Sequence, residues 1–475
     1  MYAYTSICIL HILQKNALLP QPPSARPSPA RLLRCFIQLL PRRALLRLPA
    51  LKNTSFYDRL FSPLVTLWLL LFQRLNADHS LDAALSHARS GGANGLKPKL
   101  SGRLRSNSTA SYSDARQRLP WQFVLEVLQL LGSKISRLHS HTLAQAWRVV
   151  LLDGSTVRLR SYDDIAKELP PHRNQQRQPS YWCLMRVVVG FCALSGAALD
   201  CALGSNGLSE QLLGAELILR ATARCLFIGD RNFGIFLIAQ VAHAKGHPVL
   251  LRLTQLRATQ LLGRALSLGD HCVTWKPTRQ TKRQAGLSAQ PIPGRLLVVR
   301  VQRPGFRSLQ LCLFTSLVDR AAYPLPELLK LYGLRWQAEL NLRYVKTQMQ
   351  SAQLEVHSAT MARKEWLASL IAYNLVRAAM LCAALHSAIE PLALSFSASR
   401  RRLEAWLEHF GATRRRAYAS WHQTLAQISQ SRLPTRRKVR PSEPRAQRHL
   451  RQGFPPLRGS RASARANLQK AQLKS

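Results

Sequence analysis

Residues 332–346 have the sequence YGLRWQAELNLRYVK, which places one carboxylate among four groups able to contact phosphate. At 3.6 residues per turn, the charged side chains share one stripe of a helix, with a tyrosine one turn ahead. These residues are Tyr332, Arg335, Glu339, Arg343 and Lys346. Charge pairs four residues apart are also common on solvated helices, where they stabilise little. Taken alone, the segment fits a salt-bridged surface helix as well as a functional one.

Two further acids follow apolar runs. Residues 147–159, WRVVLLDGSTVRL, combine an apolar run, a turn at Asp153-Gly and a second β-rich run, which predicts a hairpin. Residues 225–234, CLFIGDRNFG, form an apolar run that breaks before Asp230 and precedes a helical stretch at 235–244. Both aspartates are therefore predicted at strand ends. An aspartate in this position is commonly a turn former or a helix N-cap, so neither alone indicates a function.

The three acids together support a more specific hypothesis. Carboxylates such as Asp153, Asp230 and Glu339 can hold a pair of divalent metals, which activate water and stabilise a leaving oxygen. We expect the three carboxyl groups to converge within a few ångströms, since paired ions stand about 3.5 to 4 Å apart. The histidines show no ligand spacing, and no two of the nine cysteines form a Cys-x-x-Cys pair.

These segments resemble the DDE transposases of bacterial insertion sequences, specifically the insertion-sequence-four family. The family signature is Tyr, two residues, Arg, three residues, Glu, six residues, Lys, and residues 332–346 match it without a gap. The sequences DGSTVRL at 153–159 and GDRNFG at 229–234 resemble its two aspartate motifs. The family more often has Gly where this chain has Asn232. The likeness runs from about residue 60 into the C-terminal region.

The resemblance implies an α/β, ribonuclease-H-like fold: a mixed sheet flanked by helices, with an inserted β-strand subdomain. It implies that Asp153, Asp230 and Glu339 are catalytic and hold two Mg²⁺ ions, with Mn²⁺ as an alternative. The implied reaction is cut-and-paste cleavage and strand transfer at the inverted-repeat ends of a mobile element. The residues implied to contact DNA are Tyr332, Arg335, Arg343, Lys346 and Trp275.

Trp275 is the only tryptophan in the segment expected to be inserted. In similar transposases an aromatic residue of the insert receives a base flipped out of the transposon end, and stacking offsets part of the few kcal/mol that this extrusion costs. A core tryptophan of a small sheet explains the same residue equally well. Both hypotheses stay open at the level of the sequence.

Patterning along the chain predicts four regions. Residues 1–45 are expected to be a disordered extension, and 46–140 a helical DNA-binding domain with apolar residues at helical spacing. Residues 141–395 are expected to form the catalytic domain, with an insertion at about 254–308. Residues 396–475 are expected to be a flexible tail, because 400–475 hold 19 Lys and Arg against three Glu and contain several prolines.

The composition agrees with a nucleic-acid partner. The chain carries 68 Lys and Arg against 23 Asp and Glu, a formal charge of +45, and 47% apolar residues provide a core. Ribosomal and basic membrane-surface proteins share such charge, so it discriminates poorly. Cysteines scattered in apolar runs favour a reducing, cytoplasmic setting, with association to the bacterial nucleoid. The resemblance, with which this charge agrees, implies a homodimer acting on double-stranded DNA. The alternatives are an inactive DNA-binding relic that inhibits an active copy, or a structure-specific nuclease of the same fold.

Overall fold

The computed structural model describes residues 27–52, 60–138, 147–173, 179–278, 290–301, 309–410 and 414–434, with a few positions near the C-terminus. The chain divides into two compact units, residues 1–302 with 308–435, and residues 303–307 with 436–475. All helices and strands from α2 to α19 belong to the first unit.

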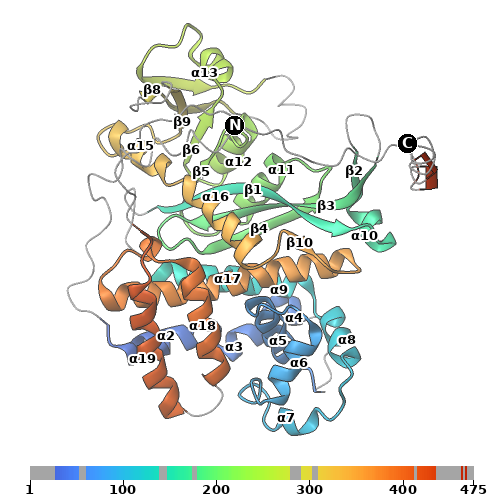
Figure 1. Cartoon of the computed structure of the whole chain (residues 1–475). Coiled ribbons are helices and arrows are strands. Elements are labelled where there is room, and N and C mark those ends of the chain that lie inside the picture. The colour runs from blue at the N-terminus through green and yellow to red at the C-terminus, as the bar shows by residue number, and fades with distance from the viewer. Residues whose placement is uncertain are drawn as a thin grey trace, which may run out of the picture. The chain divides into compact units, whose positions relative to one another are not determined.

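A ten-stranded mixed sheet forms the centre of this first unit (Figure 1). The strands are β1 (Arg148–Arg160), β2 (Pro171–Arg173), β3 (Pro179–Cys192), β4 (Ala198–Ser205), β5 (Cys225–Gly229), β6 (Val249–Leu253), β7 (Gly269–Trp275), β8 (Ile292–Val301), β9 (Leu309–Thr315) and β10 (Gln353–Leu354). Their order is β2-β3-β1-β5-β6-β9-β8-β7, with β4 on β3 and β10 on β1. β1, β5 and β6 are parallel, whereas β3 pairs with β1 and β4 antiparallel. The fold is the expected ribonuclease-H-like α/β fold.

Alternation along β1 gives the sheet two buried faces. Val150 and Leu152 enter the core shared with α11 (Glu210–Arg220) and α12 (Phe236–Ala244). Leu151 and Val157 enter the core on the opposite face, shared with α9 (Trp121–Leu138) and α17 (Ala359–Ser387). Successive side chains of a strand point to opposite faces, so odd-numbered residues of β1 point toward α17 and even-numbered residues toward α11. Figure 1 shows these helices on the two sides of the sheet.

The first aspartate segment is not a hairpin. β1 runs unbroken through Asp153-Gly154, and β3 pairs with it from Val150 to Arg160. The prediction of a turn was wrong because a long antiparallel partner satisfies the backbone on both sides of the Asp-Gly pair. The strand β4 was not predicted.

The inserted strands extend the main sheet. After β6 and α13 (Gln255–Leu262), β7 pairs with β8, β8 with β9, and β9 with β6. The strands β7 and β8 thus lie within the β-strand insertion predicted at about 254–308. Because β9 pairs with both β6 and β8, the insertion is hydrogen-bonded to the catalytic sheet instead of forming a separate sheet.

The N-terminal region is helical, as expected. Its helices are α2 (Pro29–Ile37), α3 (Arg42–Leu46), α4 (Pro49–Lys52), α5 (Pro63–Leu75), α6 (Leu81–Arg89), α7 (Leu100–Arg103) and α8 (Ala110–Arg118). The prediction of a disordered extension fails for residues 29–45, because α2 buries Leu32, Leu33 and Phe36. Residues 1–26 lie outside the described part of the chain.

The expected flexible tail also begins too early. Residues 396–430 form α18 (Phe396–Phe410) and α19 (Arg414–Gln430), which bury Trp406 and Trp421. The Phe36 ring lies 6.0 Å from the Trp406 ring and 4.9 Å from the Trp421 ring, measured between centroids. Within this basic segment, apolar residues of α18 and α19 pack against α2. The three helices therefore share one core cluster.

The helix α17 is long and apolar enough to cross a membrane by length and composition, but its apolar window is entirely buried inside the protein. It is the central helix of the larger core. The remaining helices are α10 (Asp163–Glu168), α15 (Leu325–Gly333) and α16 (Trp336–Arg343).

Candidate active site

Asp153 and Asp230 lie where the parallel pairing of β1 and β5 ends. The two strands pair from Arg148 opposite Cys225 to Leu151 opposite Ile228. Asp153 lies two residues further along β1, and Asp230 follows β5 directly. Asp153 therefore lies inside β1 and not at a strand end as predicted, whereas Asp230 does follow its strand. Both aspartates stand just beyond the last paired residues of the parallel strands β1 and β5.

The signature segment consists of three short helical pieces. α15 ends at Gly333, α16 begins at Trp336, and a π-helical turn η1 covers Tyr344–Gln348. The junction uses tight backbone bonds, from the Arg335 amide to the Tyr332 carbonyl and from the Ala338 amide to the Arg335 carbonyl, each 3.0 Å. Single π-helical turns recur at functional sites, and this one contains Lys346.

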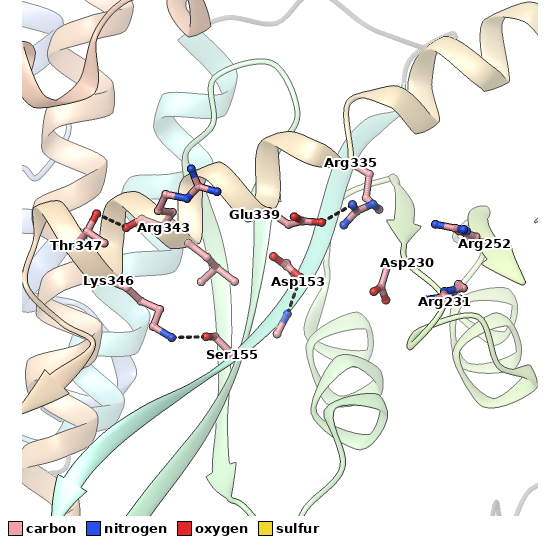
Figure 2. A pocket seen from close by; sticks show the side chains of 12 residues that line it. Asp153, Ser155, Asp230, Arg231, Arg252, Arg335, Glu339, Arg343, Lys346 and Thr347 are labelled. Atoms are coloured by element: carbon pink, nitrogen blue, oxygen red, sulfur yellow. Dashed lines mark hydrogen bonds and ion pairs between the residues drawn. The ribbon is translucent and has the colours of Figure 1, made fainter. Parts of the chain in front are cut away.

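The middle of β1, the residues after β5 and the signature segment line a pocket of about 490 Å³ (Figure 2). It is lined by Asp153, Gly154, Ser155, Asp230, Arg231, Arg252, Arg335, Glu339, Leu342, Arg343, Lys346 and Thr347. The pocket thus brings together the three predicted acids and three of the five residues predicted to contact DNA. Figure 2 shows the acids in the middle, with Arg343 and Lys346 on one side and Arg231 and Arg252 on the other.

The surroundings of Asp153 raise the pKa of its carboxyl group. Burial raises the pKa of the Asp153 carboxyl to about 8, the charges of Glu339 and Asp230 raise it too, and Arg335 opposes them. Glu339 forms an ion pair with Arg335, whose side chain is only 7% exposed. The Asp230 carboxylate accepts hydrogen bonds from the backbone amides of Asn232, at 2.8 Å, and Phe233, at 3.4 Å. Asp153 likewise accepts a 3.1 Å hydrogen bond from the Gly154 backbone amide, so backbone amides hold the two aspartates and a guanidinium holds the glutamate.

The pocket suits a hard divalent cation, because Asp153, Asp230 and Glu339 offer carboxylate oxygens as ligands. The charges of Asp230 and Glu339 also act on Asp153, and a bound cation would offset them. The expected convergence does not hold, since no three Asp, Glu, His or Cys side chains in the described ranges form a ligand cluster. Like charges repel one another, and Arg335 engages Glu339 instead. The carboxylate chemistry still suits a cation, and Asp153, Asp230 and Glu339, which line one pocket, are the residues that would hold it.

The predicted DNA-contacting cations differ in their surroundings. The Lys346 ammonium donates a 3.0 Å hydrogen bond to the Ser155 hydroxyl, and Arg343 is exposed at the pocket rim. Tyr332 is 3% exposed and does not line the pocket. Burial raises the pKa of its hydroxyl, while the charges of Arg335 and Arg252 act against that shift. Because the Tyr332 side chain is buried and outside the pocket lining, its direct contact with DNA stays a prediction.

Trp275 lies outside the pocket and is partly buried at the end of β7. Its ring packs edge-on at centroid distances of 5.9 Å from Phe236 and 4.7 Å from Phe314. These contacts fit the hypothesis of a core tryptophan. Stacking on a flipped base stays a prediction.

Comparison with known proteins places this pocket in a family. The profile of the Transposase DDE domain matches residues 146–375, which include all three acids and the whole signature segment. The chain is also 27% identical over 294 residues to the transposase InsG for insertion sequence element IS4 of Escherichia coli (strain K12). Residues 146–375 thus match the transposase DDE domain family, and the chain is similar to a transposase of the insertion-sequence-four element. The match to InsG covers 58% of this chain and 65% of that relative, so it spans slightly less than two thirds of the relative's length.

Among solved structures, the chain is similar to piggyBac transposase in a synaptic complex with hairpin DNA. The TM-score is 0.41 at 9% sequence identity, over 86% of each chain.

The sequence analysis did not predict several residues that line the pocket. Ser155 lies two residues after Asp153, and the alternation of a strand predicts that both face the same way. Arg252 is the single charged residue of the apolar strand β6, a signal that would have found it. Arg231 follows Asp230 directly, so the second aspartate motif already contained it.

Proposed function

We propose that this protein is the DNA transposase of a bacterial insertion sequence, which cleaves the inverted-repeat ends of its element and joins them to target DNA. The observation that carries this proposal is the pocket itself, because the three acids and three signature cations of the family line one cavity at the edge of the sheet. The proposed cofactor is Mg²⁺, two ions per site. The proposed assembly is a homodimer on double-stranded DNA in the cytoplasm.

The acidic and the basic side chains of the pocket have different proposed roles. Asp153, Asp230 and Glu339 would hold divalent cations, which when bound supply an activated water and stabilise the departing 3′ oxygen. Arg343, at the rim, and Lys346, held by Ser155, are placed to contact phosphates beside the cut. The freed 3′ hydroxyl is then the nucleophile for the opposite strand and later for the target. This scheme needs no covalent enzyme intermediate.

A DNA substrate would also change the partners of Arg335. In the protein its guanidinium pairs with Glu339, four residues along the same helical segment. Two non-bridging oxygens of a phosphate can accept both prongs of the planar guanidinium, so DNA would compete with Glu339 for this cation. Release of Glu339 would then make its carboxylate free to act with Asp153.

The proposal is tested with purified protein, a plasmid carrying the flanking inverted repeats, and a second supercoiled plasmid as target. With Mg²⁺ we expect excision of the element, and joining of a pre-cut 3′ hydroxyl end to the target. Cleavage without joining would favour the structure-specific nuclease. Binding without either reaction, at every divalent metal tried, would favour the inactive relic and contradict the proposal.

A further inference from the structure

A fourth carboxylate, Glu210, touches both segments that carry the catalytic aspartates. It begins the helix α11, whose N-cap Ser209 accepts a hydrogen bond from the Leu212 amide. The Glu210 carboxylate accepts a hydrogen bond from the side-chain amide of Asn232, two residues after Asp230. On its other side it lies against Gly154, where an added Cβ would stand only 2.6 Å from Glu210 Cδ.

The Glu210 carboxyl group occupies the space beside Gly154 that a side chain at this position would take. Even-numbered residues of β1 face α11, so Gly154 faces Glu210, whereas Asp153 and Ser155 face the signature segment. Glu210 therefore lies behind the strand and does not line the pocket. Its influence on the reaction must pass through a neighbour.

Asn232 is that neighbour. Its backbone amide donates a 2.8 Å hydrogen bond to Asp230 Oδ1, so the position of Asn232 sets the direction of the carboxylate. The side-chain amide of Gln211 donates to the Asn232 carbonyl at 3.1 Å and to its side-chain oxygen at 2.6 Å. Two consecutive residues of α11 thus hold both ends of the Asn232 side chain.

We propose that Glu210 is a positioning residue, which holds Asn232 and through it the Asp230 carboxylate at a fixed place beside β1. This inference rests on the proposed function and deepens it. We call this linkage from Glu210 through Asn232 to Asp230 the brace. It connects β1 and the end of β5 through α11, at the point where the two strands no longer pair with each other. It acts on orientation alone, so an uncharged acceptor of the same shape at position 210 should serve nearly as well.

The test compares Glu210→Ala and Glu210→Gln with Glu216→Ala, a matched control on the same helix that pairs with Arg220 outside the pocket. We expect single-turnover cleavage of a labelled inverted-repeat end to fall about ten- to hundredfold in Glu210→Ala, the effect of a misplacement of about 1 Å. Glu210→Gln, whose side-chain oxygen still accepts from Asn232, should stay within about threefold of wild type. Glu216→Ala should match wild type.

Two further measurements address the mechanism. Glu210→Ala should be no more harmful when added to Asn232→Ala, because both changes break one linkage. Hydrogen exchange of the backbone amides of residues 230–234 should be faster in Glu210→Ala and unchanged in the Glu216→Ala control. The exchange experiment needs no DNA or metal, so it reports on the brace even if wild type proves not to cleave DNA, which would contradict only the proposed function.

Three results would overturn the inference. Equal loss of cleavage in Glu210→Gln and Glu210→Ala would show that the negative charge itself is required. Additive losses in the double variant would show that Glu210 does not act through Asn232. Unchanged exchange at residues 230–234 in Glu210→Ala would show that it braces nothing.

Discussion

At the scale of single residues, Arg335 decides how the signature segment is interpreted. A solvent-exposed pair between residues four apart contributes at most about 1 kcal/mol, and such a pair was the ordinary explanation of this sequence. The Arg335 side chain is instead 7% exposed, beside a pocket that holds three acids. Its burial and its effect on the pKa of Asp153 place it in the electrostatics of the site.

We expect Arg335→Gln to slow single-turnover cleavage of a labelled end by at least about tenfold at saturating protein, because a poorly placed phosphate is misaligned for attack. Arg335→Lys should restore only part of the rate, since an ammonium cannot reproduce the two-pronged guanidinium contact. Lys330→Gln, outside the pocket lining, is the control. Wild-type rates for Arg335→Gln would show that this arginine serves only the helix.

The residue types of the site could be predicted from the sequence, but their contacts could not. The spacing of Arg335, Glu339 and Lys346 identified the pocket-forming segment, and apolar runs located Asp153 and Asp230. The burial of Tyr332 and the brace at Glu210 depend on packing between elements distant in sequence, which spacing does not encode.

At the scale of elements, local sequence patterns predicted helices and strands correctly where no contact with a distant segment overrode them. The helix expected at 235–244 and the strand before Asp230 both formed. The Asp-Gly turn signal failed because β3 pairs with β1 through that point. The segments that form α2, α18 and α19 were expected to be disordered or flexible. These helices pack against one another in one core cluster, and composition does not reveal such contacts.

The packing of α2 gives a direct prediction. Phe36 is 8% exposed and lies against Trp406 and Trp421. Phe36→Ala should lower the free energy of unfolding by about 3 to 5 kcal/mol, the usual loss for a buried phenylalanine. Ile37→Ala is the matched control, because Ile37 on the same helix is 50% exposed. Equal melting temperatures for Phe36→Ala and Ile37→Ala would contradict the account of a folded N-terminal helix.

At the scale of the whole molecule, the charge of +45 is distributed unevenly along the chain. Residues 436–475 contain 12 Lys and Arg against one Glu, counted from the sequence. The preceding helices α18 and α19 instead contribute buried residues to the core. The segment for non-specific DNA attraction is therefore expected to start after Thr435 and not at residue 396.

Truncation after Thr435 should weaken binding to any duplex and flatten the dependence of log affinity on log salt, because fewer counterions are released. The melting temperature should stay close to that of the full chain. Truncation after Ser395 should in contrast unfold the protein, since it removes Trp406 and Trp421 from the core. Loss of preference for one sequence at an unchanged salt slope would mean that residues 436–475 read bases.

The central claim is that Asp153, Asp230 and Glu339 act as one metal-dependent site. The most direct measurement is single-turnover cleavage of a labelled inverted-repeat end, alongside DNA binding, for Asp153→Asn, Asp230→Asn and Glu339→Gln. We predict that each variant binds DNA as well as wild type does and shows no Mg²⁺-dependent cleavage, because each loses a carboxylate needed to hold the cations. Cleavage at the wild-type rate by any one of the three would contradict the claim.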